Sequence, residues 1–337
     1  MFKARLVPYR LRFKEAATTS RSTMLDKETF FIELTDTSNS QRRGVGEIPI
    51  FRGLSAEDTP DFTSTLQQFC SDFSLDSVPD LSCVKFGVES AMADMAIRTN
   101  PITEPFSYQI NGLIWMGNKD EMFRRICTKL DDGFKCLKLK IGGIDFENEI
   151  DLLRFIRSKF SPDTLELRLD ANGSFSPSNA LERLERLSRY GIHSIEQPIK
   201  QGQTVEMARI VASSPIAIAL DEELIGTWTD AGRINILDTI KPHYIILKPS
   251  LCGGFESADK WISLATERNI GWWATSALES NVGLTAIALW LRQYNVTMPQ
   301  GLGTGALYTN NVASPLRLEG ERLIFDPTLP LPDIPAI

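Results

Sequence analysis

Histidine is almost absent from this chain, and its scarcity narrows the chemistry that the protein can perform. Only His193 and His243 occur among the 337 residues, and each precedes the functional end of an expected strand by several positions. A Ser-His-Asp hydrolase needs a histidine as its base, and histidine-rich metal sites need several. We therefore expect neither kind of site, and proton transfer must fall to other side chains.

Cysteine pairs and long apolar runs are missing as well. The five cysteines are an odd number without Cys-x-x-Cys spacing, which indicates reduced thiols and neither a disulfide framework nor a zinc site. No apolar run approaches the length that spans a bilayer, and the start MFKARLVPYRLRF leads into a strand pattern instead of a cleavable signal. The net charge of −7 argues against nucleic acid or a membrane surface as a partner. We expect a cytoplasmic protein.

Five short aliphatic runs each carry a charged residue at or near their carboxyl end. The runs are CLKLKIG, LELRLDANG, HSIEQPI, IAIALDEE and YIILKPS, and the charged residues, 25 to 30 positions apart, are Lys140, Asp170, Glu196, Asp221 and Lys248. This spacing holds one strand and one helix, the length of a β/α unit, and predicts neighbouring parallel strands. In a barrel of such units every strand ends on the same face, where active sites are built. The charged groups should therefore meet at one mouth.

Three carboxylates that converge on one mouth would repel one another unless a hard cation lay between them. Carboxylate oxygens are the ligands that Mg2+ prefers, so Asp170, Glu196 and Asp221 are candidate metal ligands. The lysines should be held near this divalent ion and partly desolvated, and we expect their pKa values to be lowered so that one acts as a base. Lys138 and Lys140 lie two apart on one strand and should share its inward face.

The chain divides into three parts by its patterns. Residues 1–108 contain strand patterns followed by helical ones and are expected to form an α+β capping domain. Residues 109–315 carry the repeating units, with eight strands that begin at QINGLIWMG and end at MPQGLGTGAL. Residues 316–337 are strand-like and are expected to return to the capping domain.

These motifs resemble the enolase superfamily, in its muconate-lactonizing subgroup. The residues that carry the match are Lys138-x-Lys140, Asp170-Ala171-Asn172-Gly173, Ile195-Glu196-Gln197-Pro198, Leu220-Asp221-Glu222 and Ile246-Leu247-Lys248-Pro249. The resemblance implies an α/β fold, a modified TIM barrel of the form (β/α)7β with an α+β capping domain. It also implies Mg2+, for which Mn2+ can substitute, on the three carboxylates, with Lys140 as the base and Lys248 across the substrate.

The resemblance implies a lyase reaction on a small carboxylate substrate. The expected step is syn-dehydration of 2-succinyl-6-hydroxy-2,4-cyclohexadiene-1-carboxylate through an ene-diolate, in menaquinone biosynthesis. Gly301-Leu302-Gly303-Thr304-Gly305 lacks the paired acidic residues of dipeptide epimerases, which disfavours that activity, and Glu223 stands where the family usually has Ser. An N-acylamino acid racemase or a related cycloisomerase or epimerase remains an alternative. A metal-binding barrel without catalysis is another, although it would not need both lysines.

Five further residues are candidates for substrate contact: Lys138, Asn172, Ser276, Glu279 and Phe51. Ser276 and Glu279 could equally cap the helix that is expected near Asn281. Phe51 belongs to one of two segments, Phe51–Leu54 and Thr18–Ser22, that match the capping-domain loops which close over the site in the family. The sequence leaves the oligomeric state open.

Overall fold

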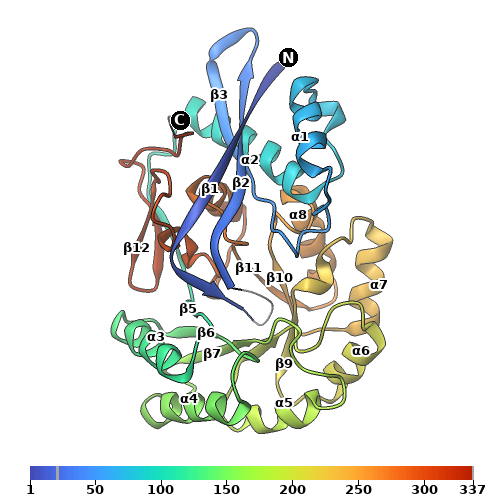
Figure 1. Ribbon diagram of the computed structural model, residues 1–337, viewed down its shortest axis with the longest axis vertical. Helices are drawn as coiled ribbons and strands as arrows, with labels where there is room; N and C mark the ends of the chain where they lie inside the picture. Colours follow the sequence, from blue (N-terminus) through green and yellow to red (C-terminus); the bar gives the residue numbers. More distant parts are fainter. Residues whose placement is uncertain (20–22, 336–337) are drawn as a thin grey trace.

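The amino-terminal part of the chain forms an antiparallel sheet covered by two helices. The computed structural model describes residues 1–19 and 23–335. The sheet has the order β1 (Phe2–Thr18), β2 (Thr23–Asp36) and β3 (Asn39–Ile48), and the helices are α1 (Phe62–Ser71) and α2 (Ser82–Thr99). Gly44 and Gly46 let α2 lie directly on β3, because a Cβ at either position would overlap a carbonyl oxygen of the helix. Long β1 and β2 cross the molecule above the barrel (Figure 1).

Seven parallel strands form the barrel wall, in the order β11-β10-β9-β8-β7-β6-β5. They are β5 (Gly112–Ile114), β6 (Cys136–Lys140), β7 (Glu166–Asp170), β8 (Ser194–Glu196), β9 (Ala217–Leu220), β10 (Tyr244–Leu247) and β11 (Gly271–Ala274). A helix follows each strand: α3 (Lys119–Asp131), α4 (Phe146–Lys159), α5 (Ala180–Ser188), α6 (Thr204–Ser213), α7 (Asp230–Ile240), α8 (Gly254–Thr266) and α9 (Asn281–Trp290). The arrangement is a (β/α)7β barrel, as the sequence predicts.

The eighth strand that the sequence predicts for the barrel is replaced by two isolated bridges. Gln300 pairs with Ile110 and Gly301 pairs with Thr275, both in parallel, and together these isolated bridges close the wall between β11 and β5. Pro299 lacks an N–H donor and the glycines that follow weaken a strand, which explains why the segment forms only bridges. The chain then turns into a short 3-10 helix, Gly303–Leu307.

A third sheet joins the end of the chain to the entry of the barrel. Its order is β12 (Leu316–Glu319), β13 (Arg322–Phe325) and β4 (Phe106–Gln109), all antiparallel. Beyond it, the carboxylate of Asp333 binds Arg43 of β3, and Arg98 of α2 donates to the carbonyl of Pro332. The final segment thus contacts the amino-terminal domain.

Two carboxylates of the capping domain, the buried Glu47 and the partly buried Glu89, bind the amino-terminal ends of barrel helices. Glu47 of β3 accepts hydrogen bonds from the backbone N–H of Ser280 and Gly283 at the start of α9. Glu89 of α2 accepts from the N–H of Phe255 and Glu256 at the start of α8. Because unpaired N–H groups and the helix dipole both favour an anion there, these contacts join the two domains.

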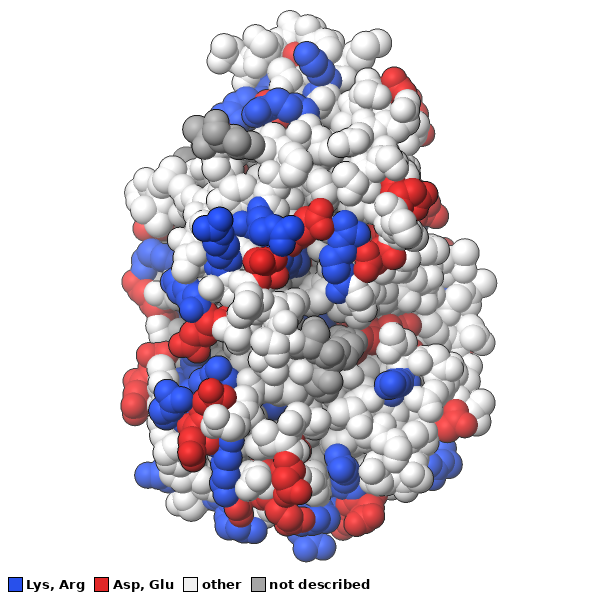
Figure 2. Space-filling model, in the orientation of Figure 1, with Lys and Arg blue, Asp and Glu red and all other residues white. Residues whose placement is uncertain are grey.

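Charged side chains are intermixed on the surface. Lys and Arg lie among Asp and Glu over the face in Figure 2. Within the part of the chain that the structure describes, no helix is both long and apolar enough to cross a membrane.

Candidate active site

The parallel register brings the five charged strand-end residues to one end of the barrel. Lys140 pairs with Asp170, and Asp170 pairs with Glu196, so these three lie side by side on β6, β7 and β8. Asp221 and Lys248 follow the last residues of β9 and β10. Parallel strands that are buried on both faces read as apolar runs, and the charged residue marks the point where each run opens to the mouth.

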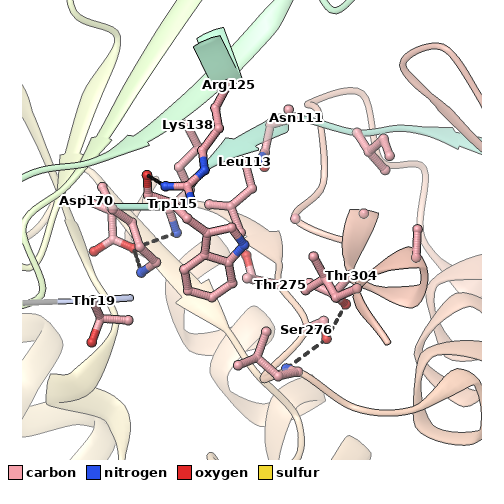
Figure 3. A pocket seen from close by; sticks show the side chains of 18 of the residues that line it. Thr19, Asn111, Leu113, Trp115, Arg125, Lys138, Asp170, Thr275, Ser276 and Thr304 are labelled. Atoms are coloured by element: carbon pink, nitrogen blue, oxygen red, sulfur yellow. Dashed lines mark hydrogen bonds and ion pairs between the residues drawn. The ribbon is translucent and has the colours of Figure 1, made fainter. Parts of the chain in front are cut away.

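The lysines bind the carboxylates directly. The Nζ atom of Lys138 lies 2.5 Å from Oε2 of Glu196. It also lies 3.1 Å from Oδ2 of Asp170 (Figure 3). The Nζ atom of Lys140 lies 2.8 Å from the same Oδ2 of Asp170. On the far side, Lys248 donates to Oδ2 of Asp221, and its Nζ lies 3.9 Å from Oε1 of Glu196. All six side chains are largely buried, and the Lys248 side chain, the most exposed of them, is 13% exposed.

Burial and proximity set the protonation states of these groups. Burial and the charge of nearby Asp170 raise the pKa of Glu196 to about 8. Burial also raises the pKa of Asp170, but the charges of Lys138 and Lys140 outweigh it and hold that pKa well below its usual value. Burial is the largest single effect on the pKa of Asp221 and raises it, but the charges of Lys248 and Lys138 together with the hydrogen bond from Lys248 outweigh burial and lower that pKa.

From the protein's own charges alone, the pKa values of Lys138 and Lys248 are raised, whereas the sequence predicts a lowering beside a bound divalent ion. Burial lowers the pKa of each lysine, as anticipated, yet the neighbouring carboxylates outweigh it and the net pKa is raised. For Lys138 these carboxylates are chiefly Asp170 and Glu196, and for Lys248 they are chiefly Asp221 and Glu196. The predicted lowering depends on a nearby divalent ion as well as on desolvation, and it stays a prediction for the metal-bound site.

The donor set fits a hard divalent cation. Across residues 1–19 and 23–335, no three His, Cys, Asp or Glu side chains form a ready metal cage, and Lys138 and Lys248 bind the carboxylates instead. However, Oε1 of Glu196 is buried without a hydrogen-bond partner among these residues. A buried carboxyl oxygen of this kind is costly unless a cation or donor satisfies it. Three adjacent carboxylates and one such oxygen match the ligand chemistry of Mg2+.

Two polar residues support the strand ends. Asn172 has a left-handed backbone (φ 44°), and its Oδ1 accepts from Lys140 at 2.8 Å while its Nδ2 donates to Glu222. The carboxylate of Glu223 accepts from Nε2 of Gln197 and from the N–H of Gly202. Glu223 therefore fixes the turn after β8, which gives this departure from the family pattern a structural use.

The remaining predicted contacts occupy different places. Phe51 and Ser276 line a cavity of about 810 Å3 at the barrel mouth, together with Lys138, Lys140 and Lys248. Glu279 is fully buried and accepts hydrogen bonds from Ser250, Ser276 and the N–H of Ala277. Its part in substrate binding stays a prediction. Of the predicted loop Thr18–Ser22, residues 20–22 lie outside the described residues.

Several cavity residues were not predicted from the sequence. Trp115 follows β5, and its ring lies 5.7 Å from the Nζ of Lys140. Arg125 of α3 donates to the carbonyls of Trp115 and Met116 and lines the cavity with Asn111 and Thr275 (Figure 3). The run QINGLIWMG marked the first barrel strand, and the polar and aromatic residues at its ends were the available signal.

Comparison with known proteins agrees with this geometry. A family model described as enolase C-terminal domain-like matches residues 121–317. The o-succinylbenzoate synthase of Desulfotalea psychrophila is 44% identical, with 92% of this chain and 95% of the relative covered. The chain belongs to the enolase superfamily. The resemblance carried by the strand-end lysines and carboxylates is thereby confirmed.

Solved structures support the enolase-superfamily fold. The crystal structure of MenC from Desulfotalea psychrophila matches with a TM-score of 0.79 at 42% identity, covering 96% of this chain and 99% of that chain. The L-Ala-D/L-Glu epimerase from Bacillus subtilis matches with a TM-score of 0.85 at 18% identity, covering 98% of this chain and 99% of that chain. At that identity the second match shows the fold alone. The predicted barrel with its capping domain is confirmed.

Proposed function

We propose that this chain is a Mg2+-dependent o-succinylbenzoate synthase of menaquinone biosynthesis. It dehydrates 2-succinyl-6-hydroxy-2,4-cyclohexadiene-1-carboxylate, a small carboxylate, to 2-succinylbenzoate. The observation that carries the proposal is the 44% identity to a synthase of this name over 92% of the chain. The two lysines that flank the carboxylates support it, since a barrel that only bound metal would not need them.

The proposal assigns Asp170, Glu196 and Asp221 to Mg2+, with Mn2+ able to substitute. A bound dication supplies positive charge that offsets the charge developing on the substrate carboxylate. Lys140 and Lys248 lie on strands four positions apart in an eight-position barrel, so they face each other across the mouth. One lysine can therefore act on each face of a substrate held between them.

Lys140 carries the proton in the proposed reaction. As the free amine it takes the proton α to the ring carboxylate, and the electron pair of that C–H bond passes into an ene-diolate. The same ammonium then gives this proton to the hydroxyl on the same ring face, so that the C–O bond breaks and water leaves. The ring gains a double bond and becomes aromatic. Lys248 stabilises the intermediate from the opposite face by its charge and by contact with the ring.

The proposal also includes the division of the chain into three segments. Residues 1–108 would form the capping domain, 109–315 the catalytic barrel and 316–337 the returning segment, in a cytoplasmic enzyme. In this arrangement Phe51 of the capping domain closes the cavity from above, as its place in the cavity wall suggests.

The rival activity is racemisation of N-acylamino acids, which the lysine pair also permits. Dehydration ends in an aromatic ring, so Lys248 needs only its charge, whereas racemisation requires Lys248 to exchange a proton. Lys248→Arg keeps the cation but cannot readily act as a base. We expect the wild type to form 2-succinylbenzoate, and we expect Lys248→Arg to retain part of this activity while it loses any racemase activity. Wild-type protein that racemises N-acylamino acids and forms no 2-succinylbenzoate would exclude the proposal.

A further inference from the structure

Two polar side chains that line the cavity each have one buried atom without a hydrogen-bond partner among the described residues. Oδ1 of Asn111 and Oγ1 of Thr275 are buried atoms without a hydrogen bond to any residue that the structure describes. Asn111 is 4% exposed and Thr275 is 9% exposed, and both line the cavity at the barrel mouth. Buried polar atoms of this kind are normally satisfied, so a site that leaves two of them together points to a ligand.

The topology places these two residues on either side of the segment Gln300–Gly301. Asn111 precedes β5 and its N–H donates to the carbonyl of Gln300, while Thr275 follows β11 and pairs with Gly301. A Cβ at Gly301 would lie 2.5 Å from Oγ1 of Thr275. The absence of a side chain at Gly301 therefore lets the side chain of Thr275 lie directly against the backbone of this segment. In Figure 3 Asn111 and Thr275 lie on the side of the cavity away from Asp170.

The neighbouring hydroxyl groups of Thr304 and Ser276 differ from these two residues, because each already donates a hydrogen bond within the protein. Thr304 donates to Oγ of Ser276, and Ser276 donates to Oε2 of the buried Glu279. The guanidinium of Arg125 is likewise committed, since its Nη1 donates to the carbonyls of Trp115 and Met116. Asn111 and Thr275 thus stand out on this wall as polar groups with unused hydrogen-bonding capacity.

We propose that Asn111 and Thr275 bind the terminal carboxylate of the substrate's succinyl side chain, an assignment that rests on the proposed function. The ring carboxylate must lie near Lys140 and the acidic cluster for its α-proton to be removed, which leaves the succinyl chain to occupy the opposite side of the cavity. There the Thr275 hydroxyl donates one hydrogen bond, and the Asn111 amide, turned about its last torsion, donates another through Nδ2. Hydrogen bonds from neutral donors to a carboxylate are stronger than neutral pairs.

An uncharged subsite of this kind also fits the lack of acidic residues at Gly301 and Gly303, at the eighth strand position of the barrel. The substrate side chain is anionic, and an acidic residue at Gly301 or Gly303 would repel it. Neutral hydrogen-bond donors beside a glycine can bind this carboxylate, so the three lysines remain available to contact the reacting ring. Asn111 and Thr275 are therefore specificity-determining residues, and the proton-transfer groups lie elsewhere.

The test measures binding of two ligands to the Mg2+-loaded protein by calorimetry. The first ligand is 2-succinylbenzoate, and the second is 2-butyrylbenzoate, in which a methyl group replaces the terminal carboxylate. Thr275→Val preserves the shape of the side chain and Asn111→Leu preserves its approximate volume. We expect each variant to bind 2-succinylbenzoate about tenfold or more weakly and 2-butyrylbenzoate as the wild type does. In turnover, KM should rise while kcat stays within a few fold.

A matched control separates this effect from loss of a buried hydroxyl. Thr285 of α9 is also buried, its Oγ1 also lacks a hydrogen-bond partner among the described residues, and it does not line the cavity. Thr285→Val should bind both ligands as the wild type does. Equal weakening of both ligands in Thr275→Val, or no weakening at all, would overturn the assignment. Wild-type turnover measured beside these titrations tests the proposed function separately, because an active wild type with unaffected variants would refute the subsite alone.

Discussion

Replacing Glu47 by Gln tests how the capping domain holds the barrel in a catalytic arrangement. Glu47 is fully buried and accepts hydrogen bonds from the N–H of Ser280 at 2.9 Å, its hydroxyl at 2.6 Å and the N–H of Gly283 at 3.0 Å. Thr29 donates a fourth bond at 2.8 Å. The segment that ends at Ser280 contributes Thr275–Leu278 to the cavity wall, so this contact couples the domain interface to the site.

The expected loss of unfolding free energy in the Glu47 variants follows from the burial and the charge of this side chain. Each hydrogen bond to a buried charged group is worth about 1.5–3 kcal/mol, and a helix cap about 1 kcal/mol. Burial raises the pKa of Glu47, which shows that desolvation already offsets part of this gain. We therefore expect Glu47→Gln to lower the free energy of unfolding by about 2 kcal/mol, and Glu47→Ala by about 4 kcal/mol, because Ala leaves the helix N–H groups buried and unpaired. The nearby ammonium of Lys27 would also lose its largest opposing charge.

Urea unfolding and amide hydrogen exchange measure this prediction. In Glu47→Gln the amides of Ser280 and Gly283 should exchange faster, and KM for the substrate should rise as the cavity wall loosens. Glu57→Gln is the matched control, because Glu57 is buried and accepts from the N–H of Cys83 within the capping domain alone. That variant should lose stability without faster exchange at Ser280 or Gly283. If Glu47→Gln unfolds at the same urea concentration as the wild type and its amides exchange at the same rate, the reasoning is refuted.

Three further predictions concern the metal site, the capping domain and the dependence of stability on pH. Glu196→Gln should weaken Mg2+ binding steeply, since a neutral amide loses the charge that offsets a dication; calorimetry that shows unchanged binding would contradict the ligand assignment. Gly46→Ala should destabilise the protein by about 3 kcal/mol in urea unfolding, because the new methyl group overlaps the carbonyl oxygen of Gly87 and must push α2 from β3. Burial raises the pKa of Glu149 from 4.5 to about 7, so between these values the folded state holds a proton that the unfolded state has lost. The stabilisation from Glu149 is fully present below pH 4.5 and is lost as pH rises through about 7, a loss of about 3 kcal/mol in the free energy of unfolding. If the wild type and Glu149→Gln show the same dependence of stability on pH, this prediction is wrong.

The barrel strands could be predicted from the sequence because their physics is simple. The run YIILKPS is apolar on both faces, ends in one charge and corresponds to β10. The run CLKLKIG alternates leucines with Lys138 and Lys140 and corresponds to β6. The segment MPQGLGTGAL was predicted as a full strand and forms only bridges at Gln300 and Gly301, since Pro299 and the glycines limit its pairing. The single strand expected near the end of the chain is a hairpin, β12 and β13, with a turn at Gly320.

The site was only partly accessible to sequence reasoning. Lysines and acids at strand ends carry a positional signal, and the strand register does bring them together. Asn111 and Thr275 carry no such signal, because a lone amide or hydroxyl beside a strand is common and only the fold shows that its atom is buried and unpaired. The direction of the lysine pKa shifts also depends on distances to Asp170, Glu196 and Asp221, which no sequence spacing provides.

Turnover of the cyclohexadiene substrate by the wild type and by Lys140→Ala tests the central claim most directly. The assay follows formation of 2-succinylbenzoate at saturating Mg2+, with Mg2+ affinity and unfolding measured on the same samples. The account predicts a wild type that forms the product and a Lys140→Ala variant that folds and binds Mg2+ but has lost turnover by several orders of magnitude, because its proton-transfer group is gone. A variant with near-normal kcat would show that another group is the base, and a wild type that forms no product would contradict the account as a whole.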